Sequence, residues 1–398
     1  MSRHSNFISR SVSSLTILLC FTLFDWNGHG YFIFYIPLII FILKGELNNF
    51  DCTFYLFLLF GVSYSLIDCL NTRSLNYTYN ILPIVNFPIL YIMGKYIGNR
   101  NSVKENVNTL WLFAISLALL TIISVYISFL KEGFSWAARD IALFGYNGGT
   151  NNYKTIAATG LYSRILPLTL FMPLLLIKKE GYGKWLLVIT AILAFICCLR
   201  LQSRSAIYIT GVSLIIPLLL GSKNNTFTKF WGIIIIVFSI IFVLSHYSDQ
   251  LAIIERFQKN NAFDNEGGEG RFTLAAKIFD NLASHPFGGL RNARYAHNLW
   301  LDCARVSGWI PMILLICITW RCIMITTRIF KCHNFPEYYR LITVILTSCL
   351  LLYFFTEPIL EGASMLFAYF CLYFGILTGS NSQIILAHES IVYRQRLL

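Results

Sequence analysis

Two arginine-bearing segments of this chain have residue types and spacings suited to binding a phosphate. The first, residues 199–205, contains Arg200 and Arg204, which are four residues apart and can share one face of a helix. Guanidinium groups bind phosphate oxygens through paired, charge-assisted hydrogen bonds, so this segment is a candidate site for a phosphate carried on a lipid. A polar turn at a membrane surface, without a ligand, is the alternative interpretation.

The second arginine segment begins with a glycine-rich run. Residues 266–270 read Glu-Gly-Gly-Glu-Gly and precede Arg271, after which apolar residues recur at 272, 275, 278, 279 and 282. This helical period predicts an amphipathic helix that starts at or near Arg271. Because the first N–H groups of a helix are unpaired, they would add to the arginine's charge and favour an anion. A solvated surface arginine is the alternative.

A third segment combines basic residues with a histidine. Residues 284–290 contain a proline and two glycines, which end the predicted helix and turn the chain back. Arg291 and Arg294 follow, and then the pair His297-Asn298, just ahead of an apolar run. A histidine at this position can act as a general base, because imidazole exchanges its proton near neutral pH.

Charged residues within apolar segments indicate a functional site or a buried partner. Asp302 and Arg305 are three residues apart, and we expect them to form a local ion pair. Arg164 lies inside another apolar segment. Its candidate partners are Asp68, Glu357 and Glu361. The two glutamates are one helical turn apart, and we expect a structural or substrate-positioning role for them rather than acid-base catalysis.

The sequence contains no pattern for a metal site or a nucleotide cofactor. Its 11 cysteines form no C-x-x-C pair and no other metal-ligand spacing. A Walker A loop, a dinucleotide fingerprint and a Ser-His-Asp pattern are also absent. We therefore expect neither a metal nor a cofactor.

The elements that must position these residues are membrane helices. Hydrophobic residues make up 56% of the 398 positions and charged residues only 13%, against about 25% in soluble domains. About twelve apolar stretches recur along the chain. They lie at 12–24, 31–43, 54–68, 78–94, 108–129, 156–177, 185–199, 205–220, 229–245, 305–327, 341–356 and 362–379. The sequence therefore predicts an all-α polytopic membrane protein, with residues 1–398 forming a single integral membrane domain.

The distribution of lysine and arginine predicts the orientation of these spans. If both termini are cytoplasmic, the short inside segments carry most of the basic residues, as in the run that holds Lys178, Lys179 and Lys184. The net charge of +12 then follows from topology and anionic lipids, so we infer no nucleic-acid partner. Two external loops stand out, a glycine- and asparagine-rich one at 130–155 and a long one at 246–296. Long loops of this kind usually carry function.

Taken together, these residues resemble the O-antigen ligase family, which are glycosyltransferases of the bacterial inner membrane. In that family a required arginine precedes a span, as Arg204 does here, and a second arginine opens a helix in the long periplasmic loop, as Arg271 does. That helix runs into a His-Pro-Phe/Leu-x-Gly stretch, which matches residues 285–289. A His-Asn pair followed by nine residues and glycine matches His297-Asn298 and Gly308.

The resemblance implies a GT-C-like architecture and a reaction at the periplasmic face. The donor would be O-antigen polysaccharide on undecaprenyl pyrophosphate and the acceptor a sugar of the lipid A core, joined by an inverting transfer without nucleotide or metal. Arg204 and Arg271 would stabilise the departing pyrophosphate, and His297 would activate or orient the acceptor hydroxyl. Further substrate contacts would come from five residues. These are Arg164, Arg200, Arg291, Arg294 and Asn298.

Two other functions remain open on the sequence. An O-antigen polymerase shares this layout and would extend the lipid-linked polysaccharide with the same arginines. A flippase for lipid-linked sugars would need charges along a path through the membrane, whereas most of the external charge lies in one loop. The distribution favours chemistry at one face, so the ligase is the preferred interpretation.

Overall fold

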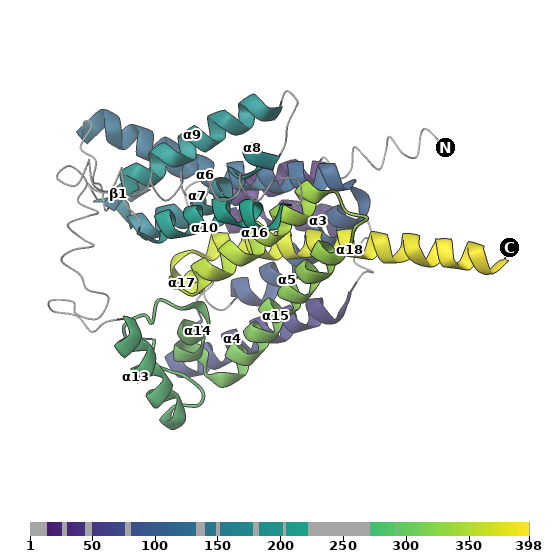
Figure 1. Cartoon of the computed structure of the whole chain (residues 1–398). Coiled ribbons are helices and arrows are strands. Elements are labelled where there is room, and N and C mark those ends of the chain that lie inside the picture. The colour runs from purple at the N-terminus through teal and green to yellow at the C-terminus, as the bar shows by residue number, and fades with distance from the viewer. Residues whose placement is uncertain are drawn as a thin grey trace.

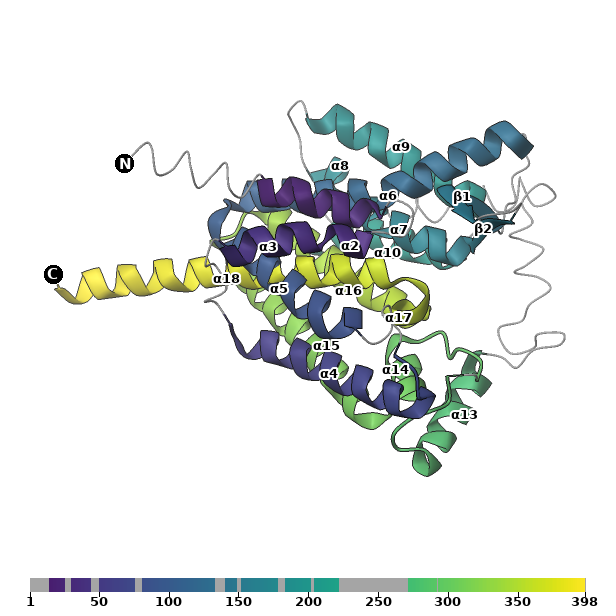
Figure 2. The same cartoon turned by 180° about the vertical axis from the view of Figure 1, so that it is seen from behind.

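The computed structural model describes ten segments of the chain, which are residues 14–25, 30–43, 50–75, 81–132, 140–148, 152–177, 183–201, 204–221, 271–291 and 293–397. These segments form a helical bundle with one β-hairpin (Figures 1 and 2). The predicted span at 229–245 and the first part of the predicted loop, 246–270, lie outside the described residues.

The helices follow the apolar stretches of the sequence closely. A helix at Ser14–Phe24 comes first. The others are α2 (Gly30–Ile33), α3 (Tyr35–Leu43), α4 (Cys52–Thr72), α5 (Leu82–Arg100), α6 (Val103–Glu132), α7 (Ala158–Thr169), α8 (Leu174–Ile177), α9 (Gly183–Leu201), α10 (Arg204–Leu220), α13 (Arg271–Ser284), α14 (Leu299–Ser307), α15 (Trp309–Lys331), α16 (Glu337–Phe354), α17 (Ile359–Gly362) and α18 (Ser364–Leu397).

The chain is a membrane protein. Of the described helices, four are long and apolar enough to cross a bilayer, namely α4, the part of α6 at Val103–Lys131, α15 and α16. Shorter apolar helices accompany them at Ser14–Phe24, Trp185–Cys198 and Tyr208–Leu220. The predicted total of about twelve spans stays a prediction.

The predicted span 31–43 is divided into α2 and α3 at Phe34, and two other predicted spans are also interrupted in the structure. The stretch 305–327 begins within α14, which ends before Gly308, so that the membrane helix α15 starts only at Trp309. The stretch 156–177 is divided into α7 and α8. Pro173 immediately precedes α8 and has no N–H to donate, so an unbroken helix cannot run through this position with all its hydrogen bonds. Gly308 in the first stretch and Pro173 in the second therefore interrupt the helix, although the residues around them are apolar.

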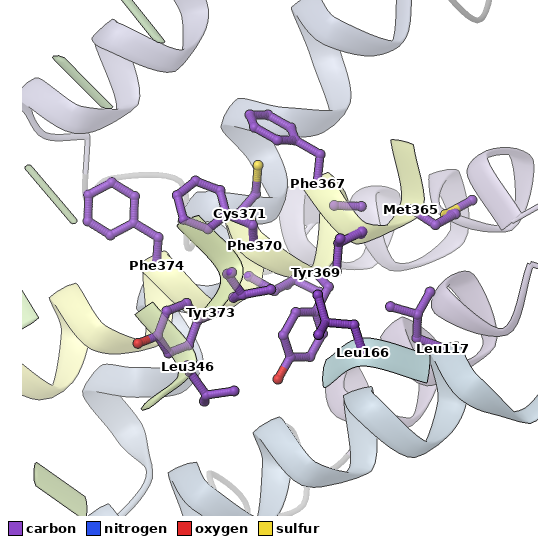
Figure 3. Packing of buried hydrophobic residues seen from close by; sticks show 14 of the residues in the cluster. Leu117, Leu166, Leu346, Met365, Phe367, Tyr369, Phe370, Cys371, Tyr373 and Phe374 are labelled. Atoms are coloured by element: carbon purple, nitrogen blue, oxygen red, sulfur yellow. The ribbon is translucent and has the colours of Figure 1, made fainter. Parts of the chain in front are cut away.

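Helix α18 forms the centre of the bundle. Its residues from Met365 to Ser380 are all buried, and they include large aromatic side chains such as Tyr369, Phe370 and Phe374 (Figure 3). A helix that is apolar around its whole circumference is expected at the centre of a bundle. The C-terminal end of α18 lies at the opposite end of the bundle from α13, α14 and α17, as both views show (Figures 1 and 2).

Glycines allow α18 to approach α5 closely. Gly94 and Gly98 of α5 face the backbone of α18, and Gly375 and Gly379 of α18 face the backbone of α5. A Cβ atom on Gly375 would lie 2.1 Å from the carbonyl oxygen of Tyr91. Small residues four apart on both helices are a common device for packing helices in membranes, where backbone contact replaces the hydrophobic effect.

A β-hairpin departs from the predicted all-α fold. Strand β1 (Asp140–Gly148) pairs antiparallel with β2 (Asn152–Ala157) within the predicted 130–155 loop, so the predicted loop is partly a sheet. Ile141 of β1 is buried, and the amide of Phe144 donates to Ser124 Oγ of α6 at 3.0 Å. The hairpin is therefore attached to the bundle.

Candidate active site

The His-Pro-Phe-Gly-Gly segment, residues 285–289, and the His-Asn segment, residues 297–308, form one folded unit. The turn after α13 lies against the C-terminal end of α14, where the amides of Gly289 and Leu290 donate to the carbonyls of Val306 and Arg305 at 3.1 and 3.0 Å. The amide of Trp309 donates back to the carbonyl of Pro286 at 3.1 Å. The two sequence motifs are thus joined by backbone hydrogen bonds in both directions.

Glycines are required where these two backbones meet. Gly308 has φ +80°, and a Cβ atom there would lie 2.1 Å from the carbonyl oxygen of Pro286. Gly288 has φ +73° and would contact the backbone of Val306 and Ser307 at 2.6 Å. L-residues with side chains rarely adopt such angles. The unit is also anchored to the bundle, because the Asn71 side chain of α4 donates to the carbonyl of Phe287 at 2.8 Å.

The spacing between His297-Asn298 and Gly308 is explained by a short capped helix. Asn298 is the N-cap of α14, and its side-chain oxygen accepts from the amides of Trp300 and Leu301 at 3.1 Å. Nine residues of helix follow before Gly308 ends it. The asparagine therefore has a structural use, in addition to the predicted substrate contact.

Asp302 fixes the backbone on both sides of His297. Its carboxylate accepts from the amide of Ala296 at 2.8 Å and from the amide of Asn298 at 3.1 Å. It also pairs with Arg305, with 3.3 Å between Nε and Oδ1, which confirms the predicted local ion pair. Burial raises the pKa of the Asp302 carboxyl, although the two amides and Arg305 oppose that shift.

Arg305 connects α14 to the preceding turn and to α17. Its guanidinium is fully buried and donates to the carbonyls of Leu290, Arg291 and Ala293 at 3.1, 2.6 and 3.1 Å. It also pairs with Glu361 of α17. Burial raises the pKa of the Glu361 carboxyl despite the opposing effect of two arginines. The segment that leads to His297 is therefore held by several charge-assisted bonds.

Arg291 is already engaged by carboxylates. Its guanidinium lies 3.1 Å from Asp68 Oδ2 of α4 and 3.8 Å from Glu361 Oε1. These contacts hold the segment after α13 against the bundle. Arg294, by contrast, has an exposed side chain. Of the two arginines predicted to meet substrate phosphates, Arg294 is therefore the one whose side chain is exposed.

His297 occupies an unusual backbone conformation beside a buried carboxylate. Its φ is +54°, in the left-handed region. Its Nδ1 atom lies 3.7 Å from Glu357 Oε2, and the side chains are 35% and 6% exposed. The ring of Tyr295 approaches the imidazole edge to face, with 6.5 Å between centroids. The half-exposed imidazole thus has one nitrogen facing the protein interior.

The remaining predicted site residues lie apart from this unit or outside the description. Arg200 is fully buried in α9, with its guanidinium 4.8 Å from the centre of the Phe129 ring, rather than in a surface turn. Arg164 pairs with Asp25 at 2.5 Å, a partner different from the three acidic residues expected. Arg204 and Arg271 begin α10 and α13, but their side chains lie outside what the structure describes.

A comparison with protein families identifies the region that contains this unit. Residues 189–316 match the family model described as O-antigen ligase. That match confirms the predicted family resemblance. No curated protein matches the chain.

The O-antigen ligase match covers the elements that carry the motifs. It begins in α9, includes α10, α13 and α14, and ends within α15. The predicted amphipathic helix is present as α13, which starts at Arg271 and buries Ile278 and Leu282. Across the described part of the chain, no three His, Cys, Asp or Glu side chains lie close enough to hold a metal ion.

Three acidic residues that contact the unit lie outside the O-antigen ligase match and far from His297 in sequence. Asp68 belongs to α4, whereas Glu357 and Glu361 follow α16. The sequence pointed to all three as candidate partners for Arg164, and to the two glutamates also as residues with a structural or substrate-positioning role. Their proximity to Arg291, Arg305 and His297 depends on the packing of α4, α14 and α17, and no local spacing in the sequence encodes it.

Proposed function

We propose that this protein is an O-antigen ligase, which transfers O-antigen polysaccharide from undecaprenyl pyrophosphate to the lipid A core. The observation that carries the proposal is the folded unit described above, in which both motifs of the family-matched region combine to present His297. The helical membrane bundle around it suits a donor and an acceptor that are both anchored in lipid. The unit would lie at the periplasmic face of the bacterial inner membrane, with both termini in the cytoplasm.

The donor pyrophosphate is assigned to Arg204 and Arg271. Each arginine is the first residue of a helix of more than ten residues, where unpaired backbone N–H groups favour an anion. As the sugar bond breaks, negative charge grows on the leaving pyrophosphate. Fixed cations stabilise this transition state more than the ground state, which lowers the barrier. In this inverting transfer the arginines would do the work that a divalent metal does in other enzymes.

The acceptor hydroxyl is assigned to His297, with Arg294 as a contact for phosphates of the core. The imidazole is partly exposed and its backbone is held by Asp302, so it can meet a hydroxyl without rearrangement of the loop. Arg164, Arg200, Arg291 and Asn298 are engaged within the protein. We therefore assign these four residues first to holding the protein's own structure, and only second to binding substrate.

The test is a reconstituted transfer reaction. Purified protein in detergent is mixed with lipid-linked O-antigen and lipid A core, without ATP or metal, and the products are separated on a gel. A new ladder on lipid A core is expected. Longer glycans that remain on the undecaprenyl carrier would instead identify a polymerase, and the absence of any covalent product would refute both transferases and favour transport.

Variants of α13 make this test specific. Arg271→Ala should lower the rate by about 10²- to 10³-fold, as loss of a charge-stabilising donor typically does. Arg271→Lys keeps the charge but loses the bidentate geometry, so near-normal activity in that variant would contradict the assignment. Lys277→Ala removes a charge from an exposed position of the same helix and serves as the matched control.

A further inference from the structure

We propose that Glu357 is a positioning residue that holds the imidazole of His297 with Nδ1 facing inward and Nε2 facing the acceptor. This inference rests on the proposed function, in which His297 activates the acceptor hydroxyl. It adds a residue outside the family-matched region and specifies which ring nitrogen acts. Three observations carry it: the backbone of His297, the orientation of its ring and the support of Glu357.

The backbone of His297 is held in a conformation that few residues adopt. At φ +54° a histidine is tolerated better than most side chains, but the conformation is still disfavoured. It persists because Asp302 accepts hydrogen bonds from the amides of both neighbours, Ala296 and Asn298. Backbone strain that the surroundings enforce in this way is typical of functional sites.

The orientation of the ring distinguishes its two nitrogens. Nδ1 is buried and lies 3.7 Å from Glu357 Oε2, within ion-pair range but longer than a hydrogen bond. Such contacts are often long before substrate binds and shorten in the reactive complex. A carboxylate accepts only, so the proton of a neutral imidazole is favoured on Nδ1. The lone pair is then on Nε2, which is the nitrogen available to a hydroxyl.

Glu357 is held in place by the helices on either side of it, α16 and α17. It follows the end of α16 at Phe354 and precedes Pro358 and α17, and its side chain is almost fully buried. Phe355, the C-cap of α16, packs its ring against Trp300 of α14 with 4.4 Å between centroids. The carboxylate and the histidine are therefore carried by two elements that are packed together.

The step that follows from this geometry conserves atoms and charge. Nε2 takes the proton of the acceptor hydroxyl while the hydroxyl oxygen forms a bond to the anomeric carbon. The bond from that carbon to the pyrophosphate oxygen breaks, and its electron pair leaves with the pyrophosphate. The resulting imidazolium donates from Nδ1 to Glu357, whose negative charge stabilises it.

Kinetics of three substitutions test this role. Glu357→Leu should lower kcat by about 10- to 100-fold, as loss of an outer residue that orients a histidine does in metal sites, while KM for both substrates stays near the wild-type value. Glu357→Gln retains an acceptor for Nδ1–H, and Glu357→Asp retains the carboxylate. Both should recover part of the loss. Glu337→Gln, at the other end of α16, is the control. Wild-type kcat in the leucine variant would overturn the proposal.

A spectroscopic readout keeps the test independent of activity. Protein labelled with ¹⁵N in its seven histidines is compared with the His297→Asn variant to assign the ring signals of His297. Nitrogen shifts should show Nδ1 protonated in the wild type and a mixture of tautomers in Glu357→Leu. An unchanged tautomer would refute the positioning role. If the wild type transfers no glycan, the proposed function fails, and the nitrogen shifts still decide whether Glu357 orients the ring.

Discussion

Gly308→Ala should open the contact between the His-Pro-Phe-Gly-Gly turn and α14. The added Cβ would lie 2.1 Å from the carbonyl oxygen of Pro286, so one of the two backbones must move. Forcing a side chain into this glycine conformation costs about 1–3 kcal/mol. Loss of two of the three backbone bonds that join the segments adds about 1 kcal/mol each. The local destabilisation is therefore about 3–5 kcal/mol.

Hydrogen exchange measures this local effect directly. Amides that exchange by local opening respond to the free energy of that opening, and each 1.4 kcal/mol corresponds to a tenfold change. Exchange at Gly289, Leu290 and Trp309 should therefore accelerate at least about 100-fold. Gly362→Ala is the matched control, because its Cβ would meet only Pro358 Cγ, at 3.6 Å. Unchanged exchange at the three amides in Gly308→Ala would refute the reasoning, since the close approach would then have no cost.

Three further substitutions test other parts of the structure. Gly375→Ala would place a Cβ 2.1 Å from the carbonyl oxygen of Tyr91, so the thermal midpoint in detergent should fall, and an unchanged midpoint would contradict the close packing of α5 and α18. Arg305→Met leaves the buried Glu361 with only the more distant Arg291 as a partner and should cost about 3–5 kcal/mol in chemical denaturation, partly recovered when Glu361 is also replaced by leucine. Asn298→Ala removes the cap of α14 and should cost about 1 kcal/mol by the same measurement, and no loss would show that the cap is not needed.

The parts of the site that the sequence predicted are encoded by local patterns. The helical period after residue 271 predicted α13, and the structure begins that helix at Arg271. The spacing of three between Asp302 and Arg305 predicted their ion pair. In each case neighbouring residues determine the outcome through the geometry of one helix.

The parts that were missed depend on contacts between distant segments. The pairs Arg291–Asp68 and Arg305–Glu361 join residues 223 and 56 positions apart, so no spacing rule could identify them. The β-hairpin was missed for a different reason. Its Asn147-Gly148 step pairs with Tyr153 and Asn152 within the ladder instead of forming a two-residue turn, and the surrounding residues were interpreted only as a surface loop.

The charges of the folded unit bear on where the two substrates bind. The segment that carries His297 contacts four carboxylates, which are Asp68, Asp302, Glu357 and Glu361. Glu357 lies beside His297, and the other three pair with Arg291 and Arg305. The guanidiniums of Arg291 and Arg305 are already paired with carboxylates, and four carboxylates against three arginines, with Arg294 included, leave no excess positive charge that would attract a pyrophosphate. This balance supports a division of labour in which His297 meets the neutral hydroxyl of the acceptor. The donor pyrophosphate then requires cations outside the unit, as its assignment to Arg204 and Arg271 provides.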